Sequence, residues 1–389
     1  MNALDWLESQ PDSFLNSVTE WASINSGSWN AQGLKQVADR ISELFQTLAP
    51  EKIDRQTISL GSGQSGPLLV FKKRSHLPNQ VFLFGHFDTV YGPEHPFQKV
   101  EVLEGNRLHG PGVCDMKGGL AILFHGLQAF EQFVEEKRFG WTIVLNSDEE
   151  IGSPVSSKEL IRTAKGHVCG LGFEPALANG GIATERKGSG VFTLRFHGKA
   201  AHSGRNPRDG RNALIPLAMF VLFCEKLNRQ QEAIYLNPAV VQGGTSYNVV
   251  PDFATCVINV RTTIPDDEQR TLKHLQDFVA DIHSQTEFRV DFDGTFTAPP
   301  KPCTPAIQQL ITVAQEAAKE IGISLPAGPT GGTCDGNRLA VAGLPNVDNL
   351  GARGASIHSP DEFIYVDSLI ERAKIFCRIL EKLNQRFDE

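Results

Sequence analysis

The sequence predicts an α/β fold, with helices on both faces of a mixed sheet, interrupted by a smaller ferredoxin-like α+β domain. Apolar strands alternate with amphipathic helices in the first half of the chain and again near its end. The central part follows the order strand, helix, strand, strand, helix, strand. The length of 389 residues also exceeds what one ordinary core accommodates. We therefore expect residues 1–189 and 297–389 to form one domain and residues 190–296 to form the inserted one.

The first domain opens with two predicted helices, because apolar residues recur at helical spacing from Phe14 to Ala22 and from Leu34 to Leu48. Three apolar runs then predict buried strands, with a helix before the last of them. The strands are "PLLVFKK" (67–73), "VFLFGHF" (81–87) and "WTIVLNS" (141–147), and the helix is "GGLAILFHGLQAF" (118–130). Ligands of such sheets gather beyond the carboxyl ends of the strands, so polar residues there are candidates for chemistry.

The inserted domain is predicted from four strands and two helices. The strands are "VFTLRFHG" (191–198), "AIYLNPAVV" (233–241), "TCVINVRT" (255–262) and "EFRVDF" (287–292), and the helices are "NALIPLAMFVLFCEKL" (212–227) and the stretch from Leu272 to Ile282. The stretch "PPKPCTP" (299–305) predicts a hinge back to the first domain, where a helix from Ile307 to Ala318 resumes the α/β pattern.

Composition excludes several classes of function. The net charge of −8 and the absence of a basic run argue against nucleic-acid binding. No apolar run approaches the roughly 20 residues of a membrane span, and the N-terminus lacks a signal-peptide pattern. Seven cysteines without a C-x-x-C pair indicate reduced thiols and a cytoplasmic protein. A metal site in this chain is therefore expected to use His, Asp and Glu.

Such residues occur where predicted strands end or loops begin. Two histidines and three carboxylates are enough to bind two metal ions if one carboxylate bridges them, and this set of ligands suits zinc. Two ions about 3.5–4 Å apart lower the pKa of a water between them toward 7. The candidates are His86, Asp88, Asp115, Glu149, Glu150, Glu174 and His358.

Two pairs of residues that are close in the sequence suggest different roles for their members at the metal site. Asp88 lies two residues after His86, on the same side of an extended chain, and can accept the second N–H of the imidazole. Glu149 and Glu150 are adjacent, so in an extended segment they point in opposite directions. One of them can bind metal while the other accepts a proton from the water.

The motifs that carry these residues resemble the M20 co-catalytic zinc hydrolases. The motifs, in the family's order, are "GHFDTV", "GPGVCDMKGG", "SDEEIGS", "GKAAHSG", "GGTCDGN" and "IHSPDEF". The family includes carboxypeptidase G2-like glutamate carboxypeptidases, acetylornithine deacetylase and succinyl-diaminopimelate desuccinylase. The resemblance implies a metal-binding α/β domain interrupted by a dimerisation domain. It also implies that His86 and Glu174 bind one zinc, that Glu150 and His358 bind the other, and that Asp115 bridges them. Glu149 would be the general base, and Asp88 would orient His86.

Further residues gain a role only through the resemblance. His202 matches a histidine that reaches the partner subunit's active site and polarises the scissile carbonyl, which would make the protein an obligate homodimer. Four residues match positions that contact the substrate: Asn248, Arg261, Gly332 and Thr333. Glutamate carboxypeptidases carry an arginine near the return hinge, whereas "DGTFTAPPKPC" offers only Lys301. A strict preference for C-terminal glutamate is therefore not expected.

We thus expect a dizinc hydrolase that cleaves an amide or peptide bond of an N-acyl amino acid or short peptide with a free carboxylate. Co²⁺ or Mn²⁺ are possible substitutes for Zn²⁺. The alternatives are a desuccinylase or deacetylase rather than a carboxypeptidase, and a catalytically weak protein that only binds metal or an amino acid. A two-metal phosphoesterase is a further class, although Arg261 and Arg353 are its only candidate phosphate ligands.

Overall fold

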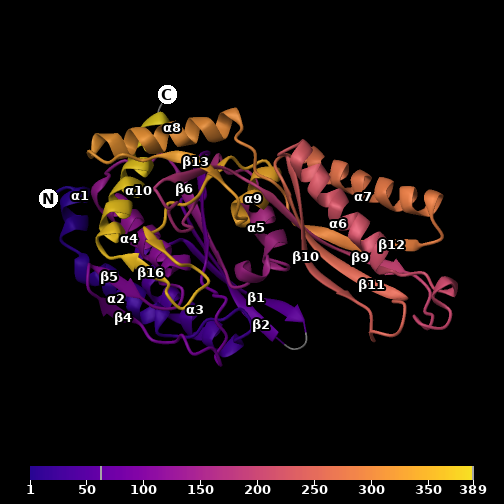
Figure 1. Ribbon diagram of the computed structural model, residues 1–389. Helices are drawn as coiled ribbons and strands as arrows, with labels where there is room; N and C mark the ends of the chain where they lie inside the picture. The colour runs from indigo at the N-terminus through magenta and orange to yellow at the C-terminus, as the bar shows by residue number, and fades with distance from the viewer. Residues whose placement is uncertain (62–63, 388–389) are drawn as a thin grey trace. The chain divides into compact units, whose positions relative to one another are not determined.

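The computed structural model describes residues 1–61 and 64–387, which form two compact units, each with its own apolar core (Figure 1). The first unit comprises Met1–Thr184, Cys303–Thr330 and Cys334–Glu389. The second comprises Glu185–Pro302 and Gly331–Thr333. Among the described residues, none of the helices combines the length and the apolar character that crossing a bilayer requires.

The first unit is built on a mixed six-stranded sheet. Its strands, in spatial order, are β1 (Lys52–Gly61), β2 (Gln64–Lys73), β6 (Gly140–Asn146), β3 (Gln80–His86), β7 (Cys169–Gly172) and β14 (Asn346–Val347). The pairs β6–β3, β3–β7 and β7–β14 are parallel, whereas β1–β2 and β2–β6 are antiparallel. The predicted α/β class with a mixed sheet is confirmed, but β1 was not predicted, because this polar edge strand has no apolar run.

Side chains of this sheet alternate between two apolar clusters. Leu69 and Leu83 face the larger cluster, while Val70 and Phe84 face the smaller one. The larger cluster takes residues from α1 (Ala3–Glu8), α2 (Pro11–Ala22), α3 (Ala31–Phe45), α4 (Gly118–Phe133), α8 (Pro305–Glu320) and α10 (Asp367–Arg386). The smaller takes residues from α5 (Ser156–Ala164) and α9 (Asp335–Val341). Helices therefore cover both faces, and burial on both sides explains why β3 and β6 are continuous apolar runs.

Two small sheets complete this unit. One has the strand order β15 (Gly354–Ala355), β16 (Phe363–Tyr365), β5 (Arg107–His109) and β4 (Glu101–Leu103). The other pairs β13 (Ala327–Thr330) with β8 (Ile182–Arg186), whose last two residues already belong to the second unit. Strand β16 pairs antiparallel with β5, with Phe363 opposite His109. The segment that follows His109 therefore runs close to the segment that precedes Phe363.

The second unit is a four-stranded antiparallel sheet with two helices. Its elements are β9 (Gly188–His197), α6 (Leu214–Gln230), β10 (Ile234–Gly243), β11 (Phe253–Thr262), α7 (Asp266–Gln285) and β12 (Arg289–Ala298). The spatial order β10-β11-β9-β12 is that of a ferredoxin-like unit, and both helices pack on one face of it (Figure 1). The unit begins at Glu185 and extends to Pro302. It is longer than the predicted 190–296 because strands β9 and β12 extend beyond the alternating apolar residues, to Gly188 and Ala298.

Short helical turns connect the longer elements. They are η1 (Gln46–Leu48), η2 (Val113–Lys117), η3 (Glu149–Ile151) and η4 (Pro207–Asp209). Two of these turns, η2 and η3, carry acidic residues that the sequence analysis singled out.

Candidate metal centre

The end of β3 presents an imidazole and a carboxylate in contact. His86 Nδ1 lies 3.2 Å from Asp88 Oδ1, and both side chains are buried. The Asp88 carboxylate also accepts hydrogen bonds from the backbone N–H groups of Glu149 (3.2 Å) and Glu150 (3.1 Å) and from Ser28 Oγ (2.8 Å). Asp88 therefore fixes the imidazole and, at the same time, the loop that follows the neighbouring strand β6.

Asp115 lies between two imidazoles. Its Oδ1 is 3.1 Å from His86 Nε2, and its Oδ2 is 3.3 Å from His358 Nε2. These three residues come from three separate segments: the end of β3, the η2 turn before α4, and the loop between β15 and β16. One carboxylate with one histidine on each oxygen is the arrangement that a bridging ligand requires.

Three glutamates surround this pair of imidazoles. Glu150 Oε2 lies 3.1 Å from His358 Nε2, while Glu149 Oε2 and Glu174 Oε1 each lie 4.0 Å from His86 Nε2. One ligand atom from each of His86, Asp115 and Glu150 lies within 4.8 Å of the other two. The structure thus brings together all seven candidates that the sequence analysis placed at strand ends and loops of the first unit.

The local conformation of the adjacent glutamates was predicted wrongly. Glu149 and Glu150 do not lie in an extended segment but in the 3₁₀ turn η3. The physical reason is Asp88, because one carboxylate can accept the N–H groups of two successive residues only when the backbone curls around it. The two side chains still diverge, with Glu149 approaching His86 and Glu150 approaching His358.

Two glycines allow the ligand segments to meet. Gly112 has a φ of +71°, a left-handed conformation that turns the chain into the segment of Asp115. A Cβ on Gly119 would lie 2.0 Å from the carbonyl oxygen of Phe173. Only glycine therefore lets the start of α4 pack against the chain directly before Glu174.

The charges of the cluster fit a cation. Burial, together with the carboxylates of Glu174 and Asp335, raises the pKa of Glu149 well above its usual range. Hydrogen bonds to Asp115 and Glu150 raise the pKa of His358 to about 10. Without a cation, Glu149 therefore favours its protonated form and His358 its charged form, while Asp115, whose pKa is lowered by its hydrogen bonds to the two histidines, stays ionised. A set of imidazole and carboxylate donors that neutralises itself in this way is suited to divalent metal ions.

Two acidic residues in this region were quoted in motifs but given no role. Asp335 accepts hydrogen bonds from Ser153 Oγ (2.5 Å) and Asn146 Nδ2 (2.8 Å), and so braces the turn that carries Glu149. Glu362 accepts the backbone N–H of Asp115 at 3.0 Å. Sequence reasoning missed both, because nothing in a single sequence separates a carboxylate that binds metal from one that binds backbone.

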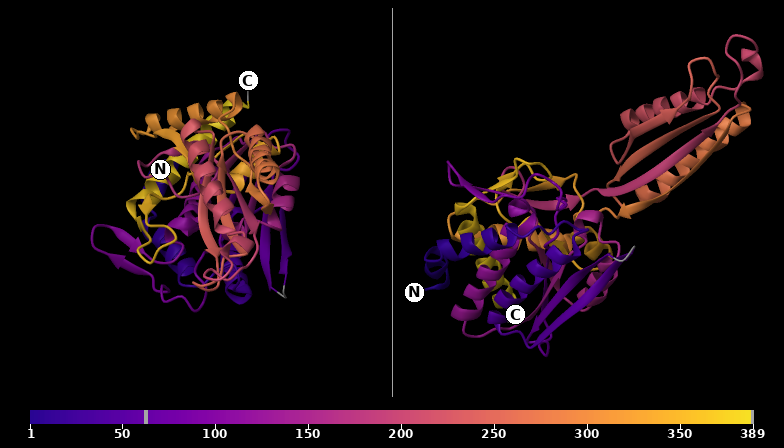
Figure 2. Two further views of the ribbon diagram at one scale, coloured as in Figure 1. Left: turned by 45° about the vertical axis from the view of Figure 1, so that its right-hand side comes forward. Right: turned by 90° about the horizontal axis from the view of Figure 1, so that it is seen from below.

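His202 and Asn248 lie side by side in the second unit. The N–H of Ser203 donates to Asn248 O at 3.0 Å, and the loops 198–212 and 244–252 extend from the same end of the sheet (Figure 2). His202 Nδ1 accepts the N–H groups of Gly204 (3.1 Å) and Arg205 (3.3 Å). A neutral imidazole that accepts at Nδ1 carries its proton on Nε2, so His202 presents an N–H donor.

Arg261 lies at the opposite end of this sheet. It pairs with Ser189, whereas Phe253 pairs with His197 at the end that leads to the two loops. Eight residues of extended strand separate Arg261 from Phe253, which corresponds to roughly 26 Å. Within one chain, the structure therefore does not bring Arg261 together with Asn248.

Gly332 and Thr333 belong to the second unit together with a buried arginine. Arg186 Nη1 donates to Gly332 O at 3.0 Å, and Arg186 and Lys301 exchange two backbone hydrogen bonds of 2.9 Å each. The sequence analysis found no arginine in the return stretch around Lys301. In the structure, Arg186 at the end of β8 lies next to Lys301.

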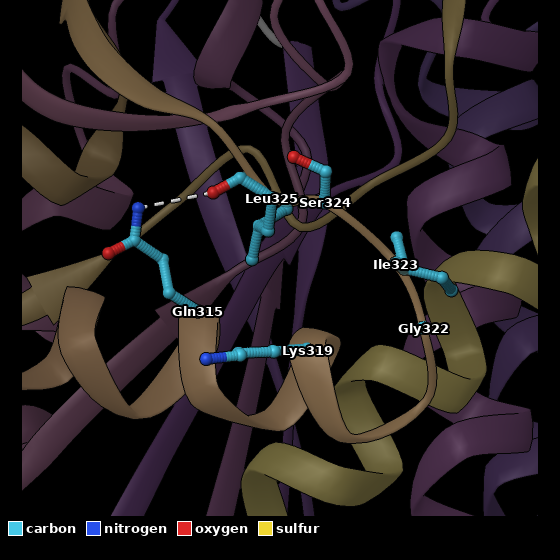
Figure 3. A pocket seen from close by; sticks show the side chains of 6 residues that line it. All are labelled: Gln315, Lys319, Gly322, Ile323, Ser324 and Leu325. Carbon is cyan, nitrogen blue, oxygen red and sulfur yellow. Dashed lines mark hydrogen bonds between the residues drawn. The ribbon is translucent and has the colours of Figure 1, made fainter.

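The first unit also has an open surface hollow of about 460 Å³ beside the C-terminal half of α8. Its lining residues are Gln315, Lys319, Gly322, Ile323, Ser324 and Leu325, and Gln315 Nε2 donates to Leu325 O at 3.2 Å (Figure 3). No histidine or carboxylate lines the hollow. Its lining therefore offers no imidazole or carboxylate ligand for a metal ion.

This chain is similar in sequence and in fold to several known proteins. The model of peptidase family M20/M25/M40 matches residues 82–382. Carboxypeptidase G2 of Pseudomonas sp. (strain RS-16) is 26% identical over 95% of this chain and 89% of its own length. A succinyl-diaminopimelate desuccinylase of Nitrosococcus oceani is 30% identical over 93% of this chain and 96% of its own. The crystal structure of aminopeptidase PepT from Bacillus cereus superposes with a TM-score of 0.81 at 20% identity, covering 96% and 98% of the two chains.

Proposed function

Since this chain belongs to peptidase family M20/M25/M40 and is therefore a metal-dependent amidohydrolase or peptidase, we propose that it is a dizinc hydrolase of N-acyl amino acids or short peptides. The scissile amide lies next to a free carboxylate of the substrate. The observation that carries the proposal is the Asp115 carboxylate, with His86 on one oxygen and His358 on the other. Glu174 completes one metal site and Glu150 the other.

The chemistry follows from these residues. Two bound zinc ions supply Lewis acidity, which lowers the pKa of water toward 7. Glu149, whose Oε2 lies 4.0 Å from His86 Nε2, accepts the proton of that water at its carboxylate and passes it to the leaving nitrogen. Asp88 holds the imidazole of His86 in one orientation and the turn of Glu149 in place.

We further propose a homodimer in which the partner subunit's inserted domain completes the site. His202, with its N–H at Nε2, donates to the scissile carbonyl, and Asn248 beside it contacts the substrate. The separation of roughly 26 Å between Arg261 and the His202 end of the sheet supports this arrangement, because one small substrate cannot touch both from a single chain. The two would therefore come from different subunits.

The surface of the second unit supports a contact between copies. Ile215, Met219 and Leu222 are exposed and recur at helical spacing on α6. Strand β10 is an edge strand, and both Val240 and Val241 on it are exposed. An exposed edge strand next to an apolar helix face suits a two-fold pairing of identical units.

The experiment is hydrolysis of a panel of N-acyl amino acids and dipeptides by protein loaded with Zn²⁺ or Co²⁺, with Glu149→Gln as the matched control. We expect turnover with at least one amide substrate and turnover at least about 100-fold slower with the control. Absence of turnover on the whole panel, with two metal ions bound per chain, would count against a hydrolase. Turnover of p-nitrophenyl phosphate instead of amides would favour the phosphoesterase class.

A desuccinylase is the second candidate, and the 30% identity to the desuccinylase of Nitrosococcus oceani favours it. The same panel separates the two, because a desuccinylase prefers a succinyl group on the scissile nitrogen, whereas a carboxypeptidase accepts other acyl groups or peptides. Mixing His202→Ala with Glu149→Ala tests the shared site, since one of the mixed sites regains both groups. A mixture as inactive as its parents after demonstrated subunit exchange would refute sharing.

A further inference from the structure

Glu362 is a fully buried carboxylate whose two oxygens are occupied by four donors. Oε1 accepts the N–H groups of Cys114 (2.9 Å) and Asp115 (3.0 Å). Oε2 accepts the N–H of Gly112 (3.1 Å) and the hydroxyl of Tyr91 (3.2 Å). Three of these donors are backbone groups of the segment that carries Asp115, so a single side chain holds that segment.

The segment from Gly112 to Asp115 needs a hydrogen-bond acceptor from another part of the chain. Asp115 has φ −113° and ψ 93°, which is not helical, and Gly112 is left-handed. Regular backbone pairing therefore does not provide partners for these N–H groups, and a buried N–H without a partner destabilises the fold. The carboxylate of Glu362 serves three of them at once.

Glu362 also belongs to the segment of His358. It lies four residues after His358, its carbonyl oxygen accepts the N–H of Gly110 at 3.2 Å, and the next residue, Phe363, pairs with His109. The main chain and the side chain of Glu362 thus both join the segment 110–115 to the segment of His358. Burial raises the pKa of Glu362 to about 7, and the buried ammonium of Lys117 favours its charged form.

We propose that Glu362 is a positioning residue of the metal centre: it fixes Asp115 relative to His358, so that one carboxylate spans both imidazoles before any metal binds. This inference rests on the proposed dizinc function. It assigns Glu362 no contact with metal or substrate. Its loss is expected to weaken zinc binding and to lower kcat, while KM for the substrate stays unchanged.

The test compares three variants of the full chain. Glu362→Gln keeps the shape but turns an NH₂ group toward backbone N–H donors, and Glu362→Asp keeps the charge but shortens the side chain. The matched control is Glu131→Gln, which also removes a largely buried charge, paired with Arg74 and with Trp141 Nε1 at the start of β6, the end opposite to the turn of Glu149. Zinc affinity of the folded, metal-free protein is measured by competition with a chromophoric chelator, and folding by circular dichroism and thermal unfolding.

We expect zinc binding about 10–100-fold weaker in Glu362→Gln and an intermediate loss in Glu362→Asp, with the wild-type affinity in Glu131→Gln. Wild-type zinc affinity in folded Glu362→Gln overturns the inference, even if that variant melts at a lower temperature. Should Glu362→Gln not fold, wild-type affinity in Glu362→Asp overturns it equally. Failure of the proposed function looks different, because the wild-type protein itself would then bind no zinc or hydrolyse no amide.

Discussion

His125 gives the protein a specific sensitivity to acid. It lies on α4, is 2% exposed, and packs against Phe14 and Phe124 with ring centroids 4.1 and 4.9 Å away. Neither ring nitrogen forms a well-aligned hydrogen bond with another described residue. Burial lowers the pKa of His125 to about 4 from 6.5, although polar groups of Ser13 and Gln128 favour the charged ring. The folded state therefore needs a neutral imidazole.

The size of the effect follows from the two pKa values. The unfolded chain binds a proton near pH 6.5, but the folded chain resists it until about pH 4, so stability falls as the pH drops through this window. A difference of about 2.5 pKa units corresponds to about 3 kcal/mol in total. Between pH 7.5 and pH 5.0, roughly 2 kcal/mol of this should already be lost.

Urea unfolding of the metal-free protein, followed by far-ultraviolet circular dichroism, measures this loss. Metal must be absent because zinc binding itself depends on pH. The matched variant is His125→Leu, which fills a similar volume and does not titrate. All other groups titrate alike in the two proteins, so the wild type should lose about 2 kcal/mol more than the variant between pH 7.5 and pH 5.0. Equal losses in both proteins would refute the assignment of a neutral, buried imidazole.

Three further outcomes follow from the site and the surface. Glu149→Gln should lower kcat by roughly 10²–10⁴, while the zinc content, measured by plasma mass spectrometry, stays at the wild-type value. Near-normal turnover would show that Glu149 is not the general base. Chelation of the metal should abolish turnover and lower the melting temperature in differential scanning fluorimetry, because a metal that binds only the folded state stabilises it. An unchanged melting temperature would argue against a metal in this cluster. Leu222→Lys should shift the protein toward monomer in sedimentation velocity and reduce turnover at low protein concentration, whereas an unaltered dimer would exclude the α6 face as the interface.

Much of the first unit is predictable because its sheet is buried on both faces. Burial makes β3 and β6 continuous apolar runs, and the abrupt change at His86 marks the carboxyl end of a strand, where ligands of such sheets gather. Strand β1 escaped prediction for the opposite reason, since it is a polar edge strand without an apolar run. The short helix α1 escaped because six residues hold too few apolar positions to show a period.

The conformation of the ligand loops could not be predicted, because long-range contacts determine it. The turn of Glu149 and Glu150 curls around Asp88, which is about 60 residues earlier in the chain. The segment of Asp115 is held by Glu362, about 250 residues later. Local propensity contains neither partner, so the sequence alone indicated an extended pair of glutamates and a glycine-rich loop.

The acidic residues of this site therefore divide into two groups by what their oxygens face. Asp115 and Glu150, the proposed metal ligands, turn an oxygen toward the Nε2 atom of an imidazole. Asp88 and Glu362 instead accept backbone N–H groups of the loops that carry these two residues, and Asp88 also contacts Nδ1 of His86. Irregular loops leave N–H groups without partners, and a carboxylate satisfies two or three at once while its charge complements the partial charge of the amides. A loop anchored in this way keeps its ligand in place without metal. The second group thus determines how well the first is preorganised, and its members are the residues whose loss should alter metal affinity without touching the metal.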